Sequence, residues 1–227
     1  MKFIIVGLGN FGASLAQKLT KQGNEVIGVD SSMAKVTALK DKISHTICLN
    51  ATDEQTVSDL PLKNTDIVIV SIGEDQGTNV LVSALFKNLG VKRLISRSIN
   101  SLHENILRAI GVDEIVRPEE ETAERWAKKL TLKGVVDSFE LNKNYSIVEV
   151  KTPKTFVGKT IEEVGFRANY NIVILTILSQ TEKASFLGKT KTVTSVQGIP
   201  DPQTRLHQDD ILVVYGFNND LYTFMKA

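Results

Sequence analysis

The sequence predicts an α/β fold, in which a doubly wound parallel sheet precedes a second, smaller α+β domain. Three observations predict this fold. Short β-branched runs alternate with helix-sized segments over the first 117 residues, a glycine-rich turn follows the first run, and the alternation stops near residue 135. Regular alternation of strands and helices is typical of parallel sheets that carry helices on both faces.

The first domain, residues 1–135, is expected to take its strands from six runs. They are residues 2–6, 25–29, 46–49, 67–72, 92–96 and 113–116. Parallel neighbours need a crossover between them, so the segments between the runs are predicted helices and the sheet is Rossmann-like. In the first of these helices Phe11, Leu15 and Leu19 recur every four residues and predict one buried face. Ser101 and Glu104 have capping-box spacing at the start of a later helix.

The second domain, residues 136–227, follows a helix predicted to run from Pro118 to Lys133. Acidic residues in the first turn of this helix and Lys128 and Lys129 near its end match the helix dipole. The domain itself is expected to hold antiparallel strands at 138–141 and 145–151, a capped helix after Thr160, a buried strand at 172–178, a turn-rich stretch to Pro202 and a strand at 211–215.

The composition excludes several classes of protein. The 27 Lys and Arg residues nearly balance the 26 Asp and Glu residues, so the chain offers no basic field for nucleic acid. Its longest stretch without a charge, residues 168–181, is shorter than the roughly 20 apolar residues of a membrane-spanning helix. The single Cys48 lies in a predicted apolar strand and cannot form an internal disulfide. The cytoplasm is therefore the expected compartment.

A glycine motif carries the strongest functional signal, because it lies between the first predicted strand and the first predicted helix. The motif is Gly7-Leu8-Gly9-Asn10-Phe11-Gly12. Gly7 permits a tight turn, Gly9 lets the backbone approach a pyrophosphate, and Gly12 allows the helix to pack closely on the sheet. Backbone amides at the helix start then bind the phosphates. The alternative is a βα turn that binds nothing.

Asp30 ends the second predicted strand 18 residues after Gly12, with Ser31 beside it. This spacing is typical of a carboxylate that accepts hydrogen bonds from ribose hydroxyls. Because its negative charge repels a 2′-phosphate, Asp30 favours NAD(H), or an adenosine nucleotide such as ATP or ADP, over NADP. The alternative is an acid that only caps the next helix.

Further candidates for cofactor binding follow the other strands, at the edge where open α/β sheets bind ligands. They are Asn50, Ala51, Thr52 and Asp53 beside the adenine, Ser71, Ile72 and Gly73 beside the phosphates or the far nucleoside, and Arg97. The alternative for Asp53 is that it caps a helix, and the alternative for Arg97 is that it forms a solvated ion pair. Glu119 is a weak candidate metal ligand, since dipole compensation explains an acid at that position equally well.

No catalytic constellation emerges from the sequence. His45, His103 and His207 are scattered along the chain and predict no metal site. Tyr222 and Lys226 have the spacing of the short-chain dehydrogenase pair, but they lie at the end of the chain, outside the nucleotide domain. We therefore expect a protein that senses a nucleotide without consuming it. The rival hypotheses are a small NAD-dependent oxidoreductase and a regulator of a transporter for another ion.

The chain resembles, over nearly its whole length, the RCK or KTN regulatory subunits of bacterial potassium transport, of the TrkA and KtrA type. The first half carries the resemblance in residues 5–12, 25–30, 50–53, 111–113 and 117–119, and the second half in residues 158–161, 167–171, 200–202 and 209–216. The resemblance implies an N-terminal nucleotide-binding domain, a C-terminal TrkA-C regulatory domain, and NAD(H), ATP or ADP as ligand. It also implies homodimers that assemble into a ring, expected to be an octamer, which gates a separate integral-membrane potassium channel or transporter subunit.

Two further expectations depend on this resemblance. Many ATP- and ADP-responsive members of the family carry Arg where this chain has Asn10, and an uncharged amide suits the less charged pyrophosphate of NAD(H). Some members bind a cyclic dinucleotide in the C-terminal domain, where the uncharged strand around Val173 is explained equally well as plain core.

Overall fold

A computed structural model describes residues 1–131, 134–184 and 190–226, with side chains left undescribed at 180–193. Contacts divide the chain into two compact units, Met1–Glu120 and Glu121–Ala227, and each is described by itself. This division falls three residues into the helix that begins at Pro118 and therefore counts most of it with the second unit. The domain boundary near residue 135 stays a prediction.

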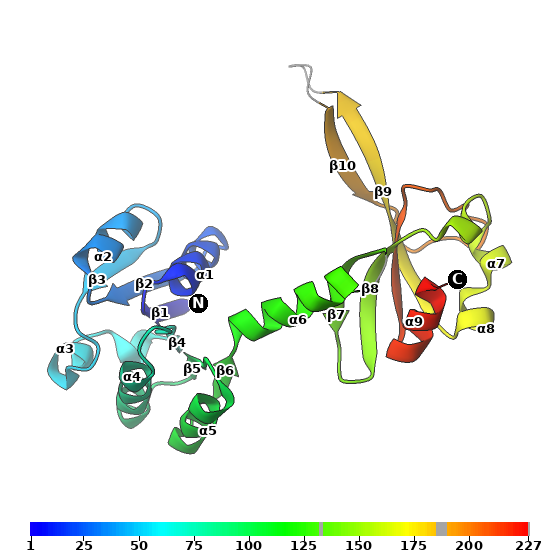
Figure 1. Ribbon diagram of the computed structural model, residues 1–227. Coiled ribbons are helices and arrows are strands. Elements are labelled where there is room, and N and C mark those ends of the chain that lie inside the picture. The colour runs from blue at the N-terminus through cyan, green and yellow to red at the C-terminus, as the bar shows by residue number, and fades with distance from the viewer. Residues whose placement is uncertain (132–133, 185–189, 227) are drawn as a thin grey trace. The chain divides into compact units, whose positions relative to one another are not determined.

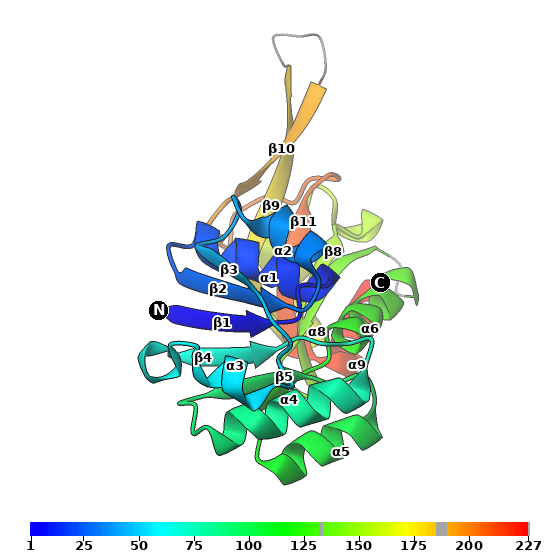
Figure 2. The ribbon, with the colours of Figure 1, turned by 90° about the vertical axis from the view of Figure 1, so that its left-hand side faces the viewer.

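The first unit is a six-stranded parallel sheet, as the sequence predicts (Figures 1 and 2). Its strand order is β3-β2-β1-β4-β5-β6. The strands are β1 (Lys2–Val6), β2 (Glu25–Asp30), β3 (His45–Cys48), β4 (Ile67–Val70), β5 (Leu94–Arg97) and β6 (Glu114–Val116). The helices are α1 (Asn10–Lys21), α2 (Met33–Leu39), α3 (Glu54–Ser58), α4 (Gln76–Asn88) and α5 (Ser101–Ile110), with a 3-10 turn at Leu62–Asn64. The strand order reverses between β1 and β4, which creates the crevice at the carboxyl ends of these strands where such folds bind ligands.

Both faces of this sheet are covered, because neighbouring residues of a strand point to opposite sides. Phe3 and Ile5 of β1 pack with residues of α1 and α2, while Ile4 and Val6 pack with residues of α3 and α4. Two helical details differ from the prediction. In α1 the buried residues are Gly12 and Ala16, whose small side chains let the helix approach the sheet closely. The predicted face of Phe11, Leu15 and Leu19 is only partly buried.

The predicted capping box at Ser101 and Glu104 is wrong. The N-cap of α5 is Asn100, whose side chain accepts a hydrogen bond from the His103 amide, so Ser101 is already inside the helix and forms no capping box. Glu104 pairs with Arg108 instead. Cys48 lies in β3, as predicted, and it is exposed because β3 is the edge of the sheet.

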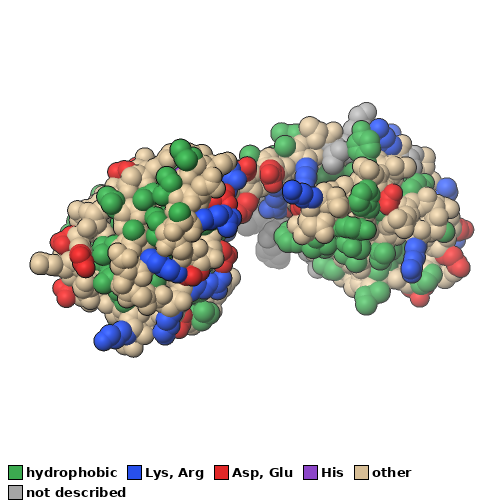
Figure 3. Space-filling view, turned by 90° about the horizontal axis from the view of Figure 1, so that it is seen from below, with side chains coloured by type: hydrophobic (Ala, Val, Ile, Leu, Met, Phe, Trp, Pro, Cys, Tyr) green, Lys and Arg blue, Asp and Glu red, His purple; other side chains and the backbone are tan. Residues whose placement is uncertain are grey.

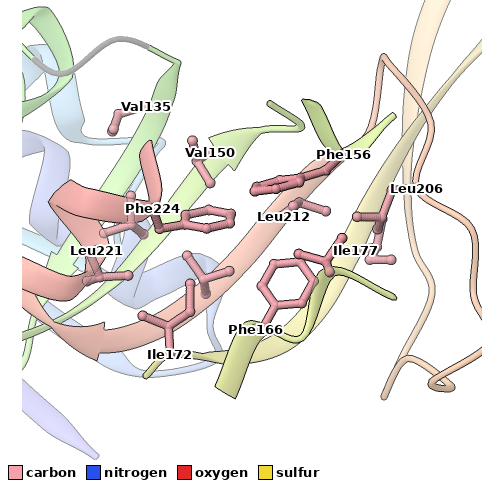
Figure 4. Packing of buried hydrophobic residues seen from close by; sticks show 13 residues of the cluster. Val135, Val150, Phe156, Phe166, Ile172, Ile177, Leu206, Leu212, Leu221 and Phe224 are labelled. Atoms are coloured by element: carbon pink, nitrogen blue, oxygen red, sulfur yellow. The ribbon is translucent and has the colours of Figure 1, made fainter. Parts of the chain in front are cut away.

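The second unit is a five-stranded antiparallel sheet in the order β10-β9-β11-β8-β7. Its strands are β7 (Val135–Glu140), β8 (Tyr145–Lys151), β9 (Val173–Ala184), β10 (Thr190–Val196) and β11 (Ile211–Phe217). Its helices are α6 (Pro118–Thr131), α7 (Ile161–Val164), α8 (Phe166–Tyr170) and α9 (Asn218–Met225), with a 3-10 turn at Lys154–Phe156. Figure 4 shows its core, in which Phe156, Phe166 and Phe224 lie close together.

Several predictions for this unit hold and others fail. The capping box at Thr160 and Glu163 is present. The strand expected to be buried over 172–178 belongs to β9, but Val173 and Leu175 are exposed, because one face of this sheet is less covered than the other. The stretch expected to be turn-rich contains strand β10, and Tyr222 lies in α9, an unpredicted helix.

Helix α6 is tied to strand β7 by ion pairs between Arg125 and Asp137 and between Lys128 and Glu140. Hydrogen bonds from Arg125 hold the pKa of the Asp137 carboxyl below its ordinary value. The predicted end of this helix at Lys133 lies outside the described residues. Within the part of the chain that the structure describes, no helix is long and apolar enough to cross a membrane. On the face shown in Figure 3, acidic and basic side chains are interspersed.

Candidate functional site

A cleft of about 390 Å³ lies at the carboxyl ends of the parallel strands, on both sides of the point where strand order reverses. The structure brings most of the predicted site residues together there. Those that line the cleft are Gly7, Gly9, Asn10, Phe11, Asp30, Ser31, Asn50, Ala51, Ser71, Ile72, Gly73, Arg97 and Glu119. Leu8, Gly12, Thr52 and Asp53 are the predicted residues that do not line it.

The glycine turn has the geometry that its sequence predicts. Gly7 has a φ of 93°, in the left-handed region, and its amide donates to the Val29 carbonyl at 2.8 Å. A Cβ on Gly12 would overlap both the Gly7 carbonyl oxygen and Ser71 Oγ, so only glycine lets α1 start this close to the turn. A Cβ on Gly9 would meet nothing within 4 Å, since this side of the turn faces the open cleft.

Helix α1 begins at this turn without a side-chain cap, because its N-cap residue is Gly9. The first-turn amides of a helix have no partners inside the helix, and the helix dipole makes this end attractive to anions. An uncapped helix start that faces a cleft is therefore suited to a phosphate group.

Asp30 is buried, with 9% of its surface exposed, and both of its oxygens already accept hydrogen bonds. Oδ2 accepts from the Leu8 amide at 2.7 Å, and Oδ1 accepts from the Ser32 amide at 2.8 Å. Asp30 therefore braces the glycine turn as well as lining the cleft. Lys35 Nζ lies 3.8 Å from Oδ2. Lys35 also lines the cleft, and sequence reasoning missed it although a lysine five residues after the key acid was a visible signal.

The segment after β3 borders the cleft through Leu49, Asn50 and Ala51. Asn50 Oδ1 accepts hydrogen bonds from both the amide and the hydroxyl of Thr52, so its side chain folds over its own loop. Asp53 caps α3 by accepting a hydrogen bond from the Gln55 amide. This is the structural role weighed above as the alternative to ligand binding.

The far end of the cleft is built around Arg97, whose side chain is 17% exposed. Its guanidinium pairs with Glu119 in the first turn of α6 and packs against the backbone of Gly73. Its Nε is buried and has no hydrogen-bond partner in the described structure. Asp75, which the sequence analysis did not propose, also lines the cleft and caps α4. Hydrogen bonds from the hydroxyl and amide of Thr78 hold the pKa of Asp75 below its ordinary value.

A buried polar cluster lies beneath this end of the cleft and was not predicted. Asn79 donates to the carbonyls of Ile72 at 2.9 Å and Arg97 at 3.2 Å, two residues that line the cleft. Its Oδ1 accepts from Ser96 Oγ and lies 3.2 Å from His103 Nε2. Burial lowers the pKa of His103, so its ring is neutral. No sequence pattern marks these residues, because they meet only through tertiary packing.

The cleft thus offers backbone amides at the start of α1, the Asp30 carboxylate as an acceptor for ribose hydroxyls, and side chains of both charges. Four carboxylates line it, those of Asp30, Glu74, Asp75 and Glu119, against the two cations Lys35 and Arg97. No group of His, Cys, Asp and Glu residues arranged to hold a metal ion is found among the described residues. The arrangement fits a nucleotide, which combines an anionic phosphate with ribose hydroxyls.

Comparisons with known proteins agree with this geometry. The family model "TrkA-N domain" matches residues 3–118. "Ktr system potassium uptake protein C" of Bacillus subtilis (strain 168) is 34% identical over 225 residues, 99% of this chain and 96% of the relative. The solved "GsuK Channel" has a TM-score of 0.67 and 19% identity, over 98% of this chain but 38% of the channel chain. "GsuK channel bound to NAD" has a TM-score of 0.50 and 20% identity, over 99% of this chain and 38% of that one. These two likenesses show a shared fold, and this chain spans about two fifths of the channel chain.

Proposed function

The chain belongs to the TrkA-N domain family, together with the Ktr potassium uptake proteins, and from this premise we propose that it is the nucleotide-sensing regulatory subunit of a potassium uptake system. One observation carries the proposal. The uncapped start of α1 and the Asp30 carboxylate line the same cleft, at the strand-order reversal where such sheets bind nucleotides.

The proposed ligand is NAD(H) or an adenosine nucleotide, ATP or ADP. The pyrophosphate lies on the amides that follow Gly9, and the ribose hydroxyls donate to Asp30, which retains acceptor capacity beyond its two backbone bonds. Asn10 adds no positive charge at the phosphates, which favours the dinucleotide. The solved GsuK channel bound to NAD supports NAD as one ligand that a protein of this fold can hold.

The proposed partner is an integral-membrane potassium channel or transporter subunit, which holds this protein at the inner face of the cell membrane. Homodimers that assemble into an octameric ring transmit the bound state, and residues 1–135 and 136–227 act as the nucleotide-binding and regulatory domains. Helix α6 is the connection between them, because it starts beside the cleft at Glu119 and is tied to β7 by ion pairs. Ligands shift such an assembly only through unequal affinity for its states.

A second ligand, a cyclic dinucleotide, is proposed for the C-terminal domain. A groove of about 370 Å³ there is lined by apolar side chains, including Ile161, Ile172 and Ile174, and by Arg167. Apolar walls suit purine rings, and an arginine suits a phosphate. Equilibrium dialysis with cyclic di-AMP tests this ligand, and Arg167→Ala is expected to weaken it.

The rival function is a small NAD-dependent oxidoreductase. Within the described residues the cleft is lined by no histidine, cysteine or tyrosine, the side chains most often used to move a proton beside a hydride transfer. Steady consumption of NADH with any carbonyl substrate would favour this rival. A regulator for another ion is distinguished by which membrane subunit copurifies with the protein.

The test of the site is calorimetric titration of the purified chain with NADH and ADP, beside mass spectrometry of nucleotide carried through purification. Asp30→Ala is expected to weaken both nucleotides by roughly 10- to 150-fold, because a hydrogen bond to a charged group contributes about 1.5–3 kcal/mol. Asp41→Ala removes an exposed acid outside the cleft and is the matched control. Unchanged affinity in Asp30→Ala would reject the assignment, and no binding by the wild-type chain would reject the function.

A further inference from the structure

A cluster of buried polar side chains lies beneath the cleft, and Asn79 is its centre. Asn79, Ser83 and Ser96 are fully buried, and His103 is 1% exposed. The hydroxyls of Ser83 and Ser96 lie 3.1 Å apart, and Ser96 Oγ donates to Asn79 Oδ1 at 3.1 Å. On its other side, the Asn79 carboxamide donates to the backbone of two segments that line the cleft. Asn79 therefore connects the buried cluster to the cleft.

The neighbours of Asn79 fix the direction of each of its hydrogen bonds. Carbonyl oxygens only accept, so Nδ2 faces the carbonyls of Ile72 and Arg97, at 2.9 and 3.2 Å. Oδ1 then accepts from Ser96 Oγ and faces His103 Nε2 at 3.2 Å, which carries the ring proton and donates. A carboxamide turned by half a rotation would lose all of these bonds. Its two donors are therefore locked toward the cleft.

Asn79 joins two segments that strand pairing does not join. The register between β4 and β5 ends one residue before Arg97. Beyond it, the Ser71 amide donates to β1 and the Ser98 amide donates to β6, which lie on opposite sides. The Asn79 carboxamide spans the space between the two segments, because it donates to Ile72 on one and to Arg97 on the other.

The separation of these two segments matters because residues on them are in contact within the cleft. A Cβ on Gly73 would overlap the Arg97 guanidinium, so this side chain lies directly on the Gly73 backbone. Gly73 follows Ile72 in the chain, and the carbonyl that Asn79 holds belongs to the peptide group between them. The hydrogen bonds of Asn79 therefore fix the wall of the cleft on the side of β4 and β5.

We propose that Asn79 is a positioning residue for the nucleotide, which holds the segments after β4 and β5 together so that they meet the far half of a dinucleotide. Asn79 is not among the residues that line the cleft, so it acts only through the segments that it holds. The inference rests on the proposed function, in which the adenosine half lies at Asp30. Strands β2 and β5, which carry Asp30 and Arg97, are three strand spacings apart, about 14 Å. A mononucleotide bound at Asp30 ends near the glycine turn, whereas a dinucleotide continues toward β4 and β5.

The test compares NADH by calorimetry with AMP, which shares its adenosine half and first phosphate. Asn79→Ala is expected to weaken NADH roughly 5- to 30-fold, the scale of two lost hydrogen bonds, and to weaken AMP less than about twofold. Circular dichroism and thermal unfolding check that the variant is folded at the temperature of the titration. Unchanged affinity for NADH would overturn the inference. Equal weakening of both ligands would also overturn it, because a general loosening of the unit has that effect.

Two further variants separate the bonds to the cleft from the contribution of the cluster to packing. Asn79→Asp keeps the shape of the side chain and the oxygen that accepts from Ser96 and His103, but it turns an acceptor toward the two carbonyls. This variant is expected to weaken NADH relative to AMP at least as much as Asn79→Ala does.

Ser96→Ala is the matched control. It removes a fully buried hydroxyl of the same cluster that donates to neither carbonyl of the cleft. The variant is expected to lower the thermal stability while its affinity for NADH stays within about twofold of the wild-type value. A loss of NADH affinity equal to that of Asn79→Ala would overturn the inference, because packing of the cluster would then explain both.

A measurement on the wild-type chain decides the matter even where a variant does not fold. Coupling between two sites is reciprocal, so a ligand that needs the bonds of Asn79 also stabilises them. NADH is expected to slow the exchange of the Asn79 side-chain amide protons with water more than AMP does, which NMR measures. Equal slowing by both ligands, or none, would overturn the inference and leave nucleotide binding intact. A wild-type chain that binds neither ligand would remove the proposed function, and this inference with it.

Discussion

The two sheets of this protein bury their residues in different ways. In the parallel sheet, all four residues of β4 are buried, because helices cover both faces. In the antiparallel sheet, burial along β8 alternates, and the side toward the aromatic core is the covered one. A row across the other side joins Phe139, Ile147, Tyr215 and Val173 in register, and its two ends are 64% and 45% exposed.

This difference in burial determines where each unit can expose polar residues that bind a ligand. A sheet covered on both faces leaves only its strand ends open, and there the first unit gathers Asp30, Ser71 and Arg97 around one cleft. The second sheet keeps a partly exposed face, so its accessible surface is broad and contains apolar side chains. Each unit is therefore expected to unfold separately when a substitution destabilises its own core.

The largest expected effect is in the second core. Phe224 of α9 is fully buried and contacts the rings of Phe156 and Phe166 (Figure 4). It also contacts the ring of Tyr170. Phe224→Ala is expected to cost about 3–5 kcal/mol of unfolding free energy, because it leaves a cavity among these rings. Urea unfolding followed by circular dichroism measures the loss, and NADH titration reports on the first unit.

The comparison predicts that NADH affinity in Phe224→Ala stays close to that of the wild-type chain while the second unit unfolds early. Tyr222→Ala, at an exposed position of the same helix, is the control and is expected to change stability little. Joint loss of both units in one transition would show that they do not fail separately.

A smaller effect is expected at the glycine turn of the first unit. Gly12→Ala places a methyl group against the Gly7 carbonyl and Ser71 Oγ, and is expected to cost about 1–3 kcal/mol through overpacking. Gly9→Ala places the same group in the open cleft. It is expected to leave the unfolding transition nearly unchanged and to weaken NADH and ADP.

Thermal unfolding measures the stability of the two glycine variants, and calorimetry on the same samples measures their affinity for NADH and ADP. Both glycines lie in one turn, so the matched substitution separates a packing requirement from a ligand requirement. Equal stability losses in the two variants would contradict the geometry of the turn.

Much of the first unit was predictable because its signals are local. The glycine turn, the acid after β2 and the alternation of strands are each visible in short windows, and they fix the parallel sheet and most of the cleft. The second unit was harder. Its β10 is polar and is defined by antiparallel pairing with β9, and α9 is a short helix defined by the packing of Leu221 and Phe224 in the core.

Some residues of the site also could not be predicted, because tertiary packing brings them there. Lys35 and Asp75 line the cleft because helices begin beside strand ends. Asn79 donates to two carbonyls that lie 25 residues apart in sequence, those of Ile72 and Arg97. Contacts of this kind depend on packing between elements, which single-sequence patterns do not contain. Cys48 lies in a strand that the sequence predicts, but its exposure follows from the edge position of β3, which no local pattern shows.

The smallest expected effect is on the pH dependence of stability, because the first unit is expected to lose unfolding free energy at a milder pH than the second. Burial holds the pKa of His103 below its ordinary value in the folded state, so the unfolded chain takes up the proton first. Stability contributed by neutral His103 is therefore fully present above about pH 6.5 and is lost as the pH falls from there toward the lower pKa of the folded state. Carboxyls with lowered pKa, such as Asp113, act only in more acidic solution.

The measurement is urea unfolding of the first unit at pH 7.0 and pH 5.5, with His103→Gln as the test variant. This variant is expected to be less stable at both pH values, because it disturbs the bond to Asn79, but to lose less stability on acidification. His207→Gln, at an exposed position of the second unit, is the matched control and is expected to keep the wild-type pH dependence. A pH dependence that survives in His103→Gln would mean that the acid sensitivity of the first unit arises elsewhere than in the buried cluster beneath the cleft.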